Sequence, residues 1–221
     1  MSLTAEDLAC RRGGREVFAG VSFALRPGDA LVLSGPNGSG KSSLLRCLAL
    51  LTPLRAGRVS WLDRPISALA AAGEDFREIF LFVGHHDGIK SALTVRENLL
   101  FASAMLRPGT EPRHLQAALE RLGLAAIADR PGRFLSAGQR RRLALARLAA
   151  LDAPLWLLDE PLAALDRQGR AALQEMIGDY RGRGGVVVAS SHGELDMPDA
   201  HGLDMSAYMA QGAMTQGAGP S

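Results

Sequence analysis

The stretch Gly35-Pro36-Asn37-Gly38-Ser39-Gly40-Lys41-Ser42 has the pattern G-x-x-x-x-G-K-S. An apolar strand candidate precedes it at 30–33, and an apolar run at 44–51 that suits a buried helix follows it. A strand, a glycine-rich loop and a helix in this order are the context of a phosphate-binding loop. The sequence therefore predicts an anion-binding loop here, and the alternative is a plain glycine-rich turn before a helix.

The residue types of this loop fit a nucleoside triphosphate and a divalent cation. Glycines let the backbone fold so that several N–H groups face one anion, and a helix beginning near Gly40 adds the positive end of its dipole. Lys41 is one of only two lysines in the chain, and its ammonium can reach the β- and γ-phosphates. The hydroxyl of Ser42 can bind Mg²⁺, which prefers oxygen ligands.

Length and composition indicate one large domain with a sizeable core, because the chain has 221 residues and 47% of them are apolar. The net charge of +2 argues against a general nucleic-acid-binding surface. The only cysteines, Cys10 and Cys47, make no disulfide framework and fit a reducing cytoplasm. No signal pattern or membrane-spanning run is present, so we expect a soluble protein or one held at a membrane by partners.

Apolar periodicity and turn residues predict an α/β protein whose central sheet is mostly parallel. Ser136 and Gln139 have capping-box spacing, as do Thr94 and Glu97, so each pair predicts the start of a helix. We expect strands at 3–10, 17–25, 58–62, 79–83 (buried on both faces), 155–158, 186–189 and, weakly, 203–209, and helices at 95–106, 113–122, from 136 and at 167–181. The sequence thus predicts one domain over 1–210, a helical subdomain inserted at about 86–150, and a disordered tail at 211–221.

Three polar side chains follow apolar strands at the edge where an open α/β sheet binds ligands. Asp159 can hold Mg²⁺, and Glu160 beside it can orient or deprotonate an attacking water. His192 follows the strand at 186–189 and can reach a γ-phosphate. The alternatives are a helix cap at Asp159 and a structural role for the histidine.

Taken in order, these motifs resemble the nucleotide-binding domains of ABC transporters. Residues 35–42 resemble the Walker A motif, 135–139 the signature motif with Ala137 where glycine is commoner, and 155–160 the Walker B motif with a catalytic glutamate. Residues 164–166 resemble the D-loop, and His192 the switch histidine. The chain departs from the family in having Arg12 where an aromatic residue stacks on adenine, and His86 where a glutamine is usual. A guanidinium plane can also stack on a base.

The resemblance implies a P-loop NTPase fold with a RecA-like parallel core sheet, an antiparallel N-terminal β part and a helical insertion. It implies ATP hydrolysis with Mg²⁺, and a head-to-tail homodimer that holds two ATP molecules between Walker A of one protomer and the signature helix of the other. The implied catalytic residues are Glu160, His192 and Lys41, and the implied Mg²⁺ ligands are Ser42, Asp159 and His86. The implied nucleotide-binding residues are Gly35, Pro36, Asn37, Gly38, Ser39, Gly40, Lys41, Ser42, Ser43, Arg12, Ser136, Gly138, Gln139 and Asp166.

Within this family, several segments are similar to the ATP-binding subunits of cytochrome c maturation (heme exporter) complexes. They are residues 84–90 followed by 93–94 and 97–99, the N-terminus that contains Arg12, and residues 134–139 and 190–195. That similarity implies a peripheral protein on the cytoplasmic face of the bacterial inner membrane, bound to polytopic membrane subunits. It also implies that ATP hydrolysis drives heme delivery to, or heme release from, a periplasmic heme chaperone. Because His85 and His86 fall in a cytoplasmic loop near the nucleotide, we expect that this chain does not bind heme itself. The alternatives are the ATPase of another small ABC exporter, a soluble ABC ATPase of DNA repair or translation, and a non-hydrolysing nucleotide-binding module.

Overall fold

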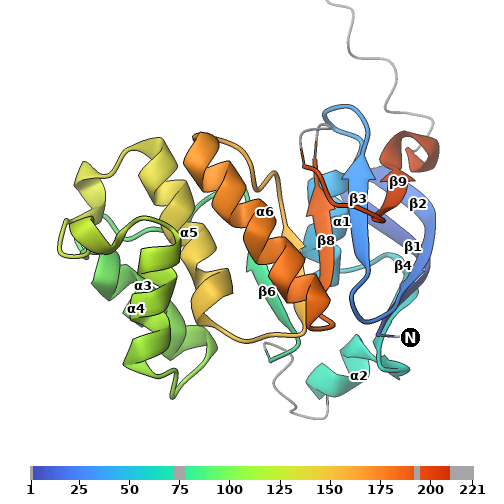
Figure 1. Cartoon of the computed structure of the whole chain (residues 1–221). Helices are drawn as coiled ribbons and strands as arrows, with labels where there is room; N and C mark the ends of the chain where they lie inside the picture. Colours follow the sequence, from blue (N-terminus) through green and yellow to red (C-terminus); the bar gives the residue numbers. More distant parts are fainter. Residues whose placement is uncertain (1, 72–77, 192–194, 210–221) are drawn as a thin grey trace, which may run out of the picture.

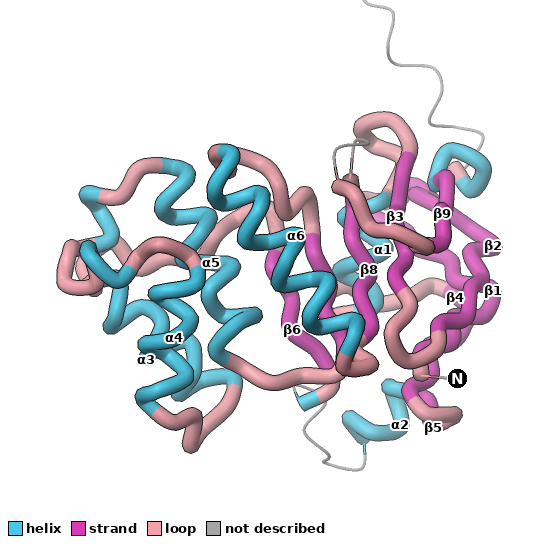
Figure 2. The backbone as a smooth tube through the Cα atoms, in the orientation of Figure 1, coloured by secondary structure: helices cyan, strands magenta, loops and turns pink. Residues whose placement is uncertain are grey.

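The computed structural model describes residues 2–71, 78–191 and 195–209. It contains an antiparallel sheet, a parallel sheet beside it, and a group of helices on the far side of the parallel sheet (Figure 1; Figure 2). Within the described residues no helix is both long and apolar enough to cross a membrane.

The antiparallel sheet has the strand order β2-β1-β4-β5. A hairpin turn at Gly13 and Gly14, both with positive φ, joins its first two strands, as such tight turns require. The predicted strands at 3–10 and 17–25 are confirmed, and both extend toward this turn. The strands are β1 (Leu3–Arg12), β2 (Arg15–Leu25), β4 (Ala56–Trp61) and β5 (Arg64–Pro65).

The second sheet is parallel throughout, with the order β6-β7-β8-β3-β9. This confirms the predicted parallel core sheet, and β7 is buried along its whole length as expected. The strands are β3 (Ala30–Ser34), β6 (Phe80–Val83), β7 (Leu155–Leu158), β8 (Val186–Ser190) and β9 (His201–Asp204).

Two strand predictions need correction. Phe80 and Phe82 are half-buried, because β6 is an edge strand of the sheet, so the expectation of burial on both faces was wrong. The strand expected at 203–209 begins earlier and ends at Asp204. The Asp204 carboxylate accepts a hydrogen bond from the N–H of Ser206 at 2.9 Å and caps the 3₁₀ turn η4 (Met205–Tyr208), which ends the strand.

Helix α1 (Lys41–Leu48) lies between the two sheets, and Leu44, Leu45 and Leu48 are fully buried there. The helix is shorter than the apolar run at 44–51 indicated. Leu50 adopts a positive φ of 54°, and Leu51 beyond it is 63% exposed. Helix α6 (Arg167–Gly182) covers the opposite face of the parallel sheet, so both faces of that sheet are packed.

The remaining helical elements, with the exception of α2, form the group seen beyond α6 in Figure 1, whereas α2 lies against β4 and β5. Both predicted capping boxes are present: Thr94 and Glu97 start α3, and Ser136 and Gln139 start α5 with reciprocal bonds of 3.0 and 3.2 Å. The remaining helical elements are α2 (Ile66–Ala71), α3 (Val95–Leu106), α4 (Pro112–Arg121), η2 (Ala125–Ile127), η3 (Gly132–Phe134) and α5 (Ala137–Ala150). The tail predicted to be disordered at 211–221 lies outside the described residues.

An aromatic stack joins α6 to β7. The rings of Tyr180 and Trp156 lie parallel with their centroids 3.8 Å apart, and the Tyr180 hydroxyl donates to the carbonyl of Ala153 at 2.7 Å. We predict that Tyr180→Ala lowers the free energy of unfolding by about 3–5 kcal/mol, the range for removing a buried aromatic ring. Tyr180→Phe removes only the hydrogen bond and should cost about 1 kcal/mol. Urea unfolding measures the free energy of unfolding of both variants. Equal losses would contradict the larger contribution expected from the ring.

The same residue gives a pH dependence. Burial raises the pKa of Tyr180 above its ordinary value. A raised pKa in the folded state contributes stability that is complete below about pH 10, where free tyrosine titrates, and that is lost at higher pH. Urea unfolding of the wild type and of Tyr180→Phe at a series of pH values tests this. The wild-type advantage should shrink above about pH 10, and a constant advantage would contradict the prediction.

Candidate active site

The phosphate-binding loop connects the end of β3 to the start of α1. Gly35, Gly38 and Gly40 all have positive φ (120°, 84° and 97°), a region that side chains disfavour. A Cβ on Gly35 would lie 2.9 Å from Ser39 Oγ, and one on Gly40 would lie 3.0 Å from the Phe18 ring. The first turn of α1 carries no side-chain cap, so its N–H groups face the loop.

Lys41 lies under this loop and is only 5% exposed. Its Nζ donates to the carbonyl oxygens of Gly35 at 2.6 Å and Pro36 at 3.1 Å. The ammonium is therefore held within the loop, where a phosphate group would meet it. The role predicted for Lys41 in binding the β- and γ-phosphates stays a prediction.

The carboxylate of Asp159, just after β7, is bonded to two hydroxyls. Its Oδ1 accepts from Ser42 Oγ at 2.9 Å and from Ser190 Oγ at 2.8 Å. Within the described part of the chain, its Oδ2 is buried and has no hydrogen-bond partner. An unsatisfied carboxylate oxygen beside a serine hydroxyl is a donor set that fits Mg²⁺. Ser42 and Asp159 thus lie together as predicted.

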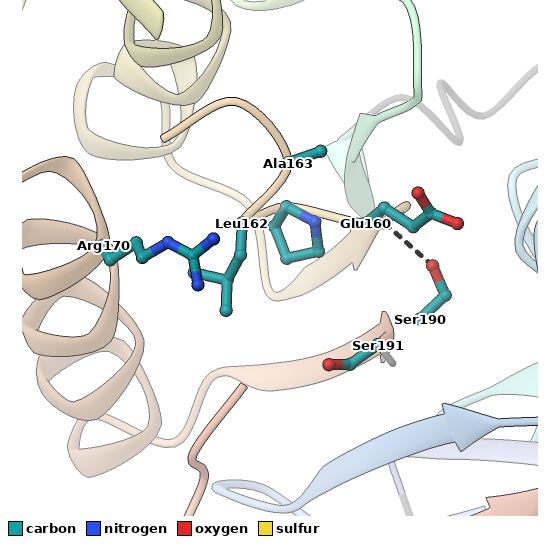
Figure 3. Close-up of a pocket in the computed structure, with 7 residues that line it drawn as sticks. Glu160, Leu162, Ala163, Arg170, Ser190 and Ser191 are labelled. Atoms are coloured by element: carbon teal, nitrogen blue, oxygen red, sulfur yellow. Dashed lines mark hydrogen bonds between the residues drawn. The ribbon is translucent and has the colours of Figure 1, made fainter. Parts of the chain in front are cut away.

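Glu160 follows directly and adopts a positive φ of 47°, which is uncommon outside glycine. Its N–H donates to Ser190 Oγ at 2.8 Å, and its carboxylate points away from Arg170 (Figure 3). On one side Glu160 lines a cavity of about 150 Å³ with Arg170 and Ser190 (Figure 3). On the other side it lines the larger cavity over the phosphate loop.

That larger cavity has a volume of about 580 Å³. It brings together three parts of the predicted site that are far apart in the sequence: the β1–β2 hairpin, the phosphate loop and the strand end at Glu160. We call it the nucleotide cavity. Its lining residues are Arg12, Gly13, Val17, Asn37, Gly38, Ser39, Gly40, Lys41, Ser42, Ser43 and Glu160. His192, predicted to lie nearby, falls outside the described residues.

Six predicted binding residues do not line this cavity. Two of them, Gly35 and Pro36, belong to the phosphate loop and accept hydrogen bonds from Lys41 Nζ. The other four lie at the starts of α5 and α6. Ser136 and Gln139 bond to each other at the start of α5, and Gly138 lies between them. Asp166 caps α6 through Gly169 N–H at 2.9 Å and pairs with Arg142 at 2.7 Å. Their predicted contact with a nucleotide bound to a second copy of the chain stays a prediction.

His86 also lies elsewhere. It is exposed and lines a cavity of about 320 Å³ with Arg46, His85, Arg147 and residues 82–84. That cavity shares no lining residue with the nucleotide cavity. The role predicted for His86 as a Mg²⁺ ligand stays a prediction.

Two residues that contact the site were not predicted from the sequence. Ser190 bonds both Asp159 and Glu160, and strand pairing offered a signal for it: Leu158 pairs with Ala189, so Asp159 and Ser190 follow side by side. Arg141 donates to the backbone of residues 159–161. It is the middle residue of Arg140-Arg141-Arg142 and precedes the buried Leu145 and Leu148 by four and seven residues, so helical spacing offered a signal for its burial.

Comparison with known protein families matches residues 18–163 to the ABC transporter family. Two curated relatives are both named cytochrome c biogenesis ATP-binding export protein CcmA. The one from Paramagnetospirillum magneticum is 47% identical over 209 residues, which cover 94% of this chain and 95% of the relative. The one from Rhodospirillum rubrum is 51% identical over 195 residues, which cover 88% of this chain and 82% of the relative.

Solved structures show the same fold. A putative ABC transporter ATP-binding protein from Pyrococcus furiosus superimposes with a TM-score of 0.81 at 21% identity, covering 95% of this chain and all of the other. A dimeric ATP-binding cassette, solved in a post-hydrolysis state with ADP and Pi, gives a TM-score of 0.74 at 22% identity. The aligned region covers 86% of this chain and 88% of the other chain.

The start of α5 packs closely on the turn after Glu160. A Cβ on Gly138 would lie 2.9 Å from the carbonyl oxygen of Ala164, whereas the neighbouring Ala137 is exposed. We predict that Gly138→Ala costs about 1–3 kcal/mol of unfolding free energy through overpacking. The matched change Ala137→Ser should stay within about 0.5 kcal/mol. Urea unfolding compares them, and equal stability of the two variants would contradict the close packing.

Proposed function

Because the chain belongs to the ABC transporter family, and within it to the cytochrome c biogenesis ATP-binding export proteins, we propose that it hydrolyses ATP to drive an export complex of c-type cytochrome biogenesis. One observation supports this most directly. The nucleotide cavity joins the phosphate loop to Glu160, and Ser42 at its edge bonds the buried carboxylate of Asp159. ATP hydrolysis needs an anion cradle, a cation site and a water-orienting base close together.

In the proposed binding step, the phosphates of ATP lie against the loop N–H groups and the start of α1. The Lys41 ammonium exchanges the carbonyls of Gly35 and Pro36 for the β- and γ-phosphates. Arg12, which also lines the nucleotide cavity, stacks its guanidinium on the adenine. Ser42 and Asp159 would hold Mg²⁺, which neutralises charge on the phosphates when it is bound.

In the proposed hydrolysis step, the Glu160 carboxylate orients a water for in-line attack on the γ-phosphorus and accepts its proton. The bond from the γ-phosphorus to the bridging oxygen breaks, and ADP and phosphate are released. His192 is proposed to hydrogen-bond the γ-phosphate, as the resemblance implies. The Ser190 hydroxyl is hydrogen-bonded to both Asp159 and the N–H of Glu160, so it fixes the position of Glu160 relative to the cation site.

We propose that the active form is a homodimer. Ser136, Gly138, Gln139 and Asp166 lie outside the nucleotide cavity of their own protomer, and the start of α5 offers backbone N–H groups to an anion. Two chains arranged head to tail would place these residues on the partner's ATP. The same arrangement would enclose two ATP molecules between the protomers.

We further propose that the dimer binds polytopic membrane subunits at the cytoplasmic face of the inner membrane, and that heme is handled by those subunits. Leu100, Phe101 and Met105 on α3 are 52%, 45% and 55% exposed, which is unusual for large apolar side chains. Phe101 and Met105 line a cavity of about 230 Å³ with Ile89. An apolar surface beside a cavity supports docking of a protein partner.

Isolation of the protein from its native membranes in mild detergent tests this assignment. We expect membrane subunits of cytochrome c maturation to accompany it. Co-isolation of a different permease would support the ATPase role but rule out heme as the cargo. The absence of any membrane protein would overturn the transport role.

The role of Glu160 has its own test. We predict that Glu160→Gln lowers kcat for ATP hydrolysis by about 10²–10⁴-fold, the usual contribution of a general base, while ATP still binds. The bound ATP should then hold the chain as a dimer, which size-exclusion chromatography detects. Glu175→Gln, an exposed position on α6, is the matched control and should hydrolyse ATP at the parent rate. Hydrolysis by Glu160→Gln at the parent rate would show that Glu160 is not the general base.

A further inference from the structure

Among the described residues, three charged side chains are buried: Lys41, Asp159 and Arg141. The first two belong to the proposed ATP site, whereas the third has no role assigned above. Arg141 lies on α5 and is only 3% exposed. A buried guanidinium is costly unless its donors are hydrogen-bonded, so its partners are informative.

Its partners are the backbone carbonyls of the turn that carries Glu160. Nη2 donates to the carbonyls of Asp159 at 2.9 Å and Glu160 at 2.8 Å, and Nε donates to that of Pro161 at 3.3 Å. The planar fork of arginine suits this arrangement, because its donors diverge in one plane toward successive carbonyls.

The remaining donor connects a second segment to the same turn. Nη1 donates to the carbonyl of Gly84 at 2.7 Å and approaches Asp87 Oδ1 at 3.4 Å. One side chain of α5 therefore joins the segment after β6 to the segment after β7. Both segments directly follow strands, at the edge of the parallel sheet where ligands bind.

The backbone of Glu160 needs such support. A φ of 47° at a glutamate is strained and persists only where the surroundings over-determine it. Ser190 holds the N–H of Glu160, as the dashed line in Figure 3 shows, and Arg141 holds its carbonyl. The two peptide planes that flank the Glu160 Cα are thus fixed from opposite sides, and they set the direction of the Cα–Cβ bond.

From this geometry we propose that Arg141 is a positioning residue for hydrolysis, acting through Glu160 and without contact to ATP. The proposal rests on the role of Glu160 proposed above. Arg141 keeps the Glu160 backbone in its strained conformation and so aims the carboxylate at the attacking water. Misplacement of a catalytic group by about 1 Å can cost about 10²-fold in rate.

The experiment compares Arg141→Lys and Arg141→Met, each in the wild-type chain and in the Glu160→Gln chain. In the wild-type chain, Arg141→Lys should lower kcat by about 10²-fold and leave the Kd for ATP within about twofold. In the Glu160→Gln chain it should leave the residual rate unchanged, because two residues that act as a unit are not additive. The lysine variant decides the test if the methionine variant does not fold.

Arg181→Lys on α6 is the matched control. Arg181 also joins backbone carbonyls of two segments, with bonds of 2.9 Å to Gly28 and 2.8 Å to Pro198, but it lines neither cavity at Glu160. Its kcat should equal that of the parent. A drop of the same size in Arg181→Lys would show that any such bond lowers the rate, and would overturn the specific role of Arg141.

The other outcomes are equally decisive. Parent-level kcat in Arg141→Lys overturns the proposal, as does an equal loss of rate in both backgrounds, which marks a purely structural residue. Loss of the folded state in Arg141→Lys also overturns it, because Arg141 would then serve the stability of the whole domain. Parent-level hydrolysis by Glu160→Gln alone refutes the proposed base instead, and so separates failure of the proposed function from failure of this inference.

Discussion

The carboxylate of Asp159 is the point on which the site depends. It accepts hydrogen bonds from Ser42 at the start of α1 and from Ser190 at the end of β8, while the backbone N–H of Asp159 donates to the carbonyl of Val83 at the end of β6. A carboxylate that is 1% exposed is stable only when its oxygens are matched by donors or a cation. Its Oδ2, which has no hydrogen-bond partner among the residues that the structure describes, therefore marks where positive charge belongs.

The rest of the fold keeps this carboxylate in place. Successive residues of a strand face opposite sides of the sheet, so Leu155 and Leu157 of β7 pack toward α1, whereas Trp156 and Leu158 pack toward α6. Because both faces are covered, the carboxyl edge of the parallel sheet is a rigid platform. The antiparallel sheet then adds one wall of the nucleotide cavity through Arg12 and Val17.

The assignment of function combines two independent kinds of information. The chemistry of the phosphate loop and of Asp159 and Glu160 supports nucleotide hydrolysis from the residues themselves. The cargo comes from similarity alone, because no feature of a phosphate site depends on what a membrane complex carries. The curated relatives, at 47% and 51% identity, therefore indicate the branch of the family, and the geometry supports the proposed mechanism.

The sequence by itself determined the elements that follow local rules. The glycine pattern placed the phosphate loop, and the pairs Thr94–Glu97 and Ser136–Gln139 placed two helix starts, because a capping box involves only neighbouring residues. Contacts between segments distant in the chain were decided only by the tertiary structure. Helical spacing places Arg141 on a buried face of α5, but local sequence gives no sign that it contacts residue 160 or that β6 forms an edge, because these features depend on which elements become neighbours.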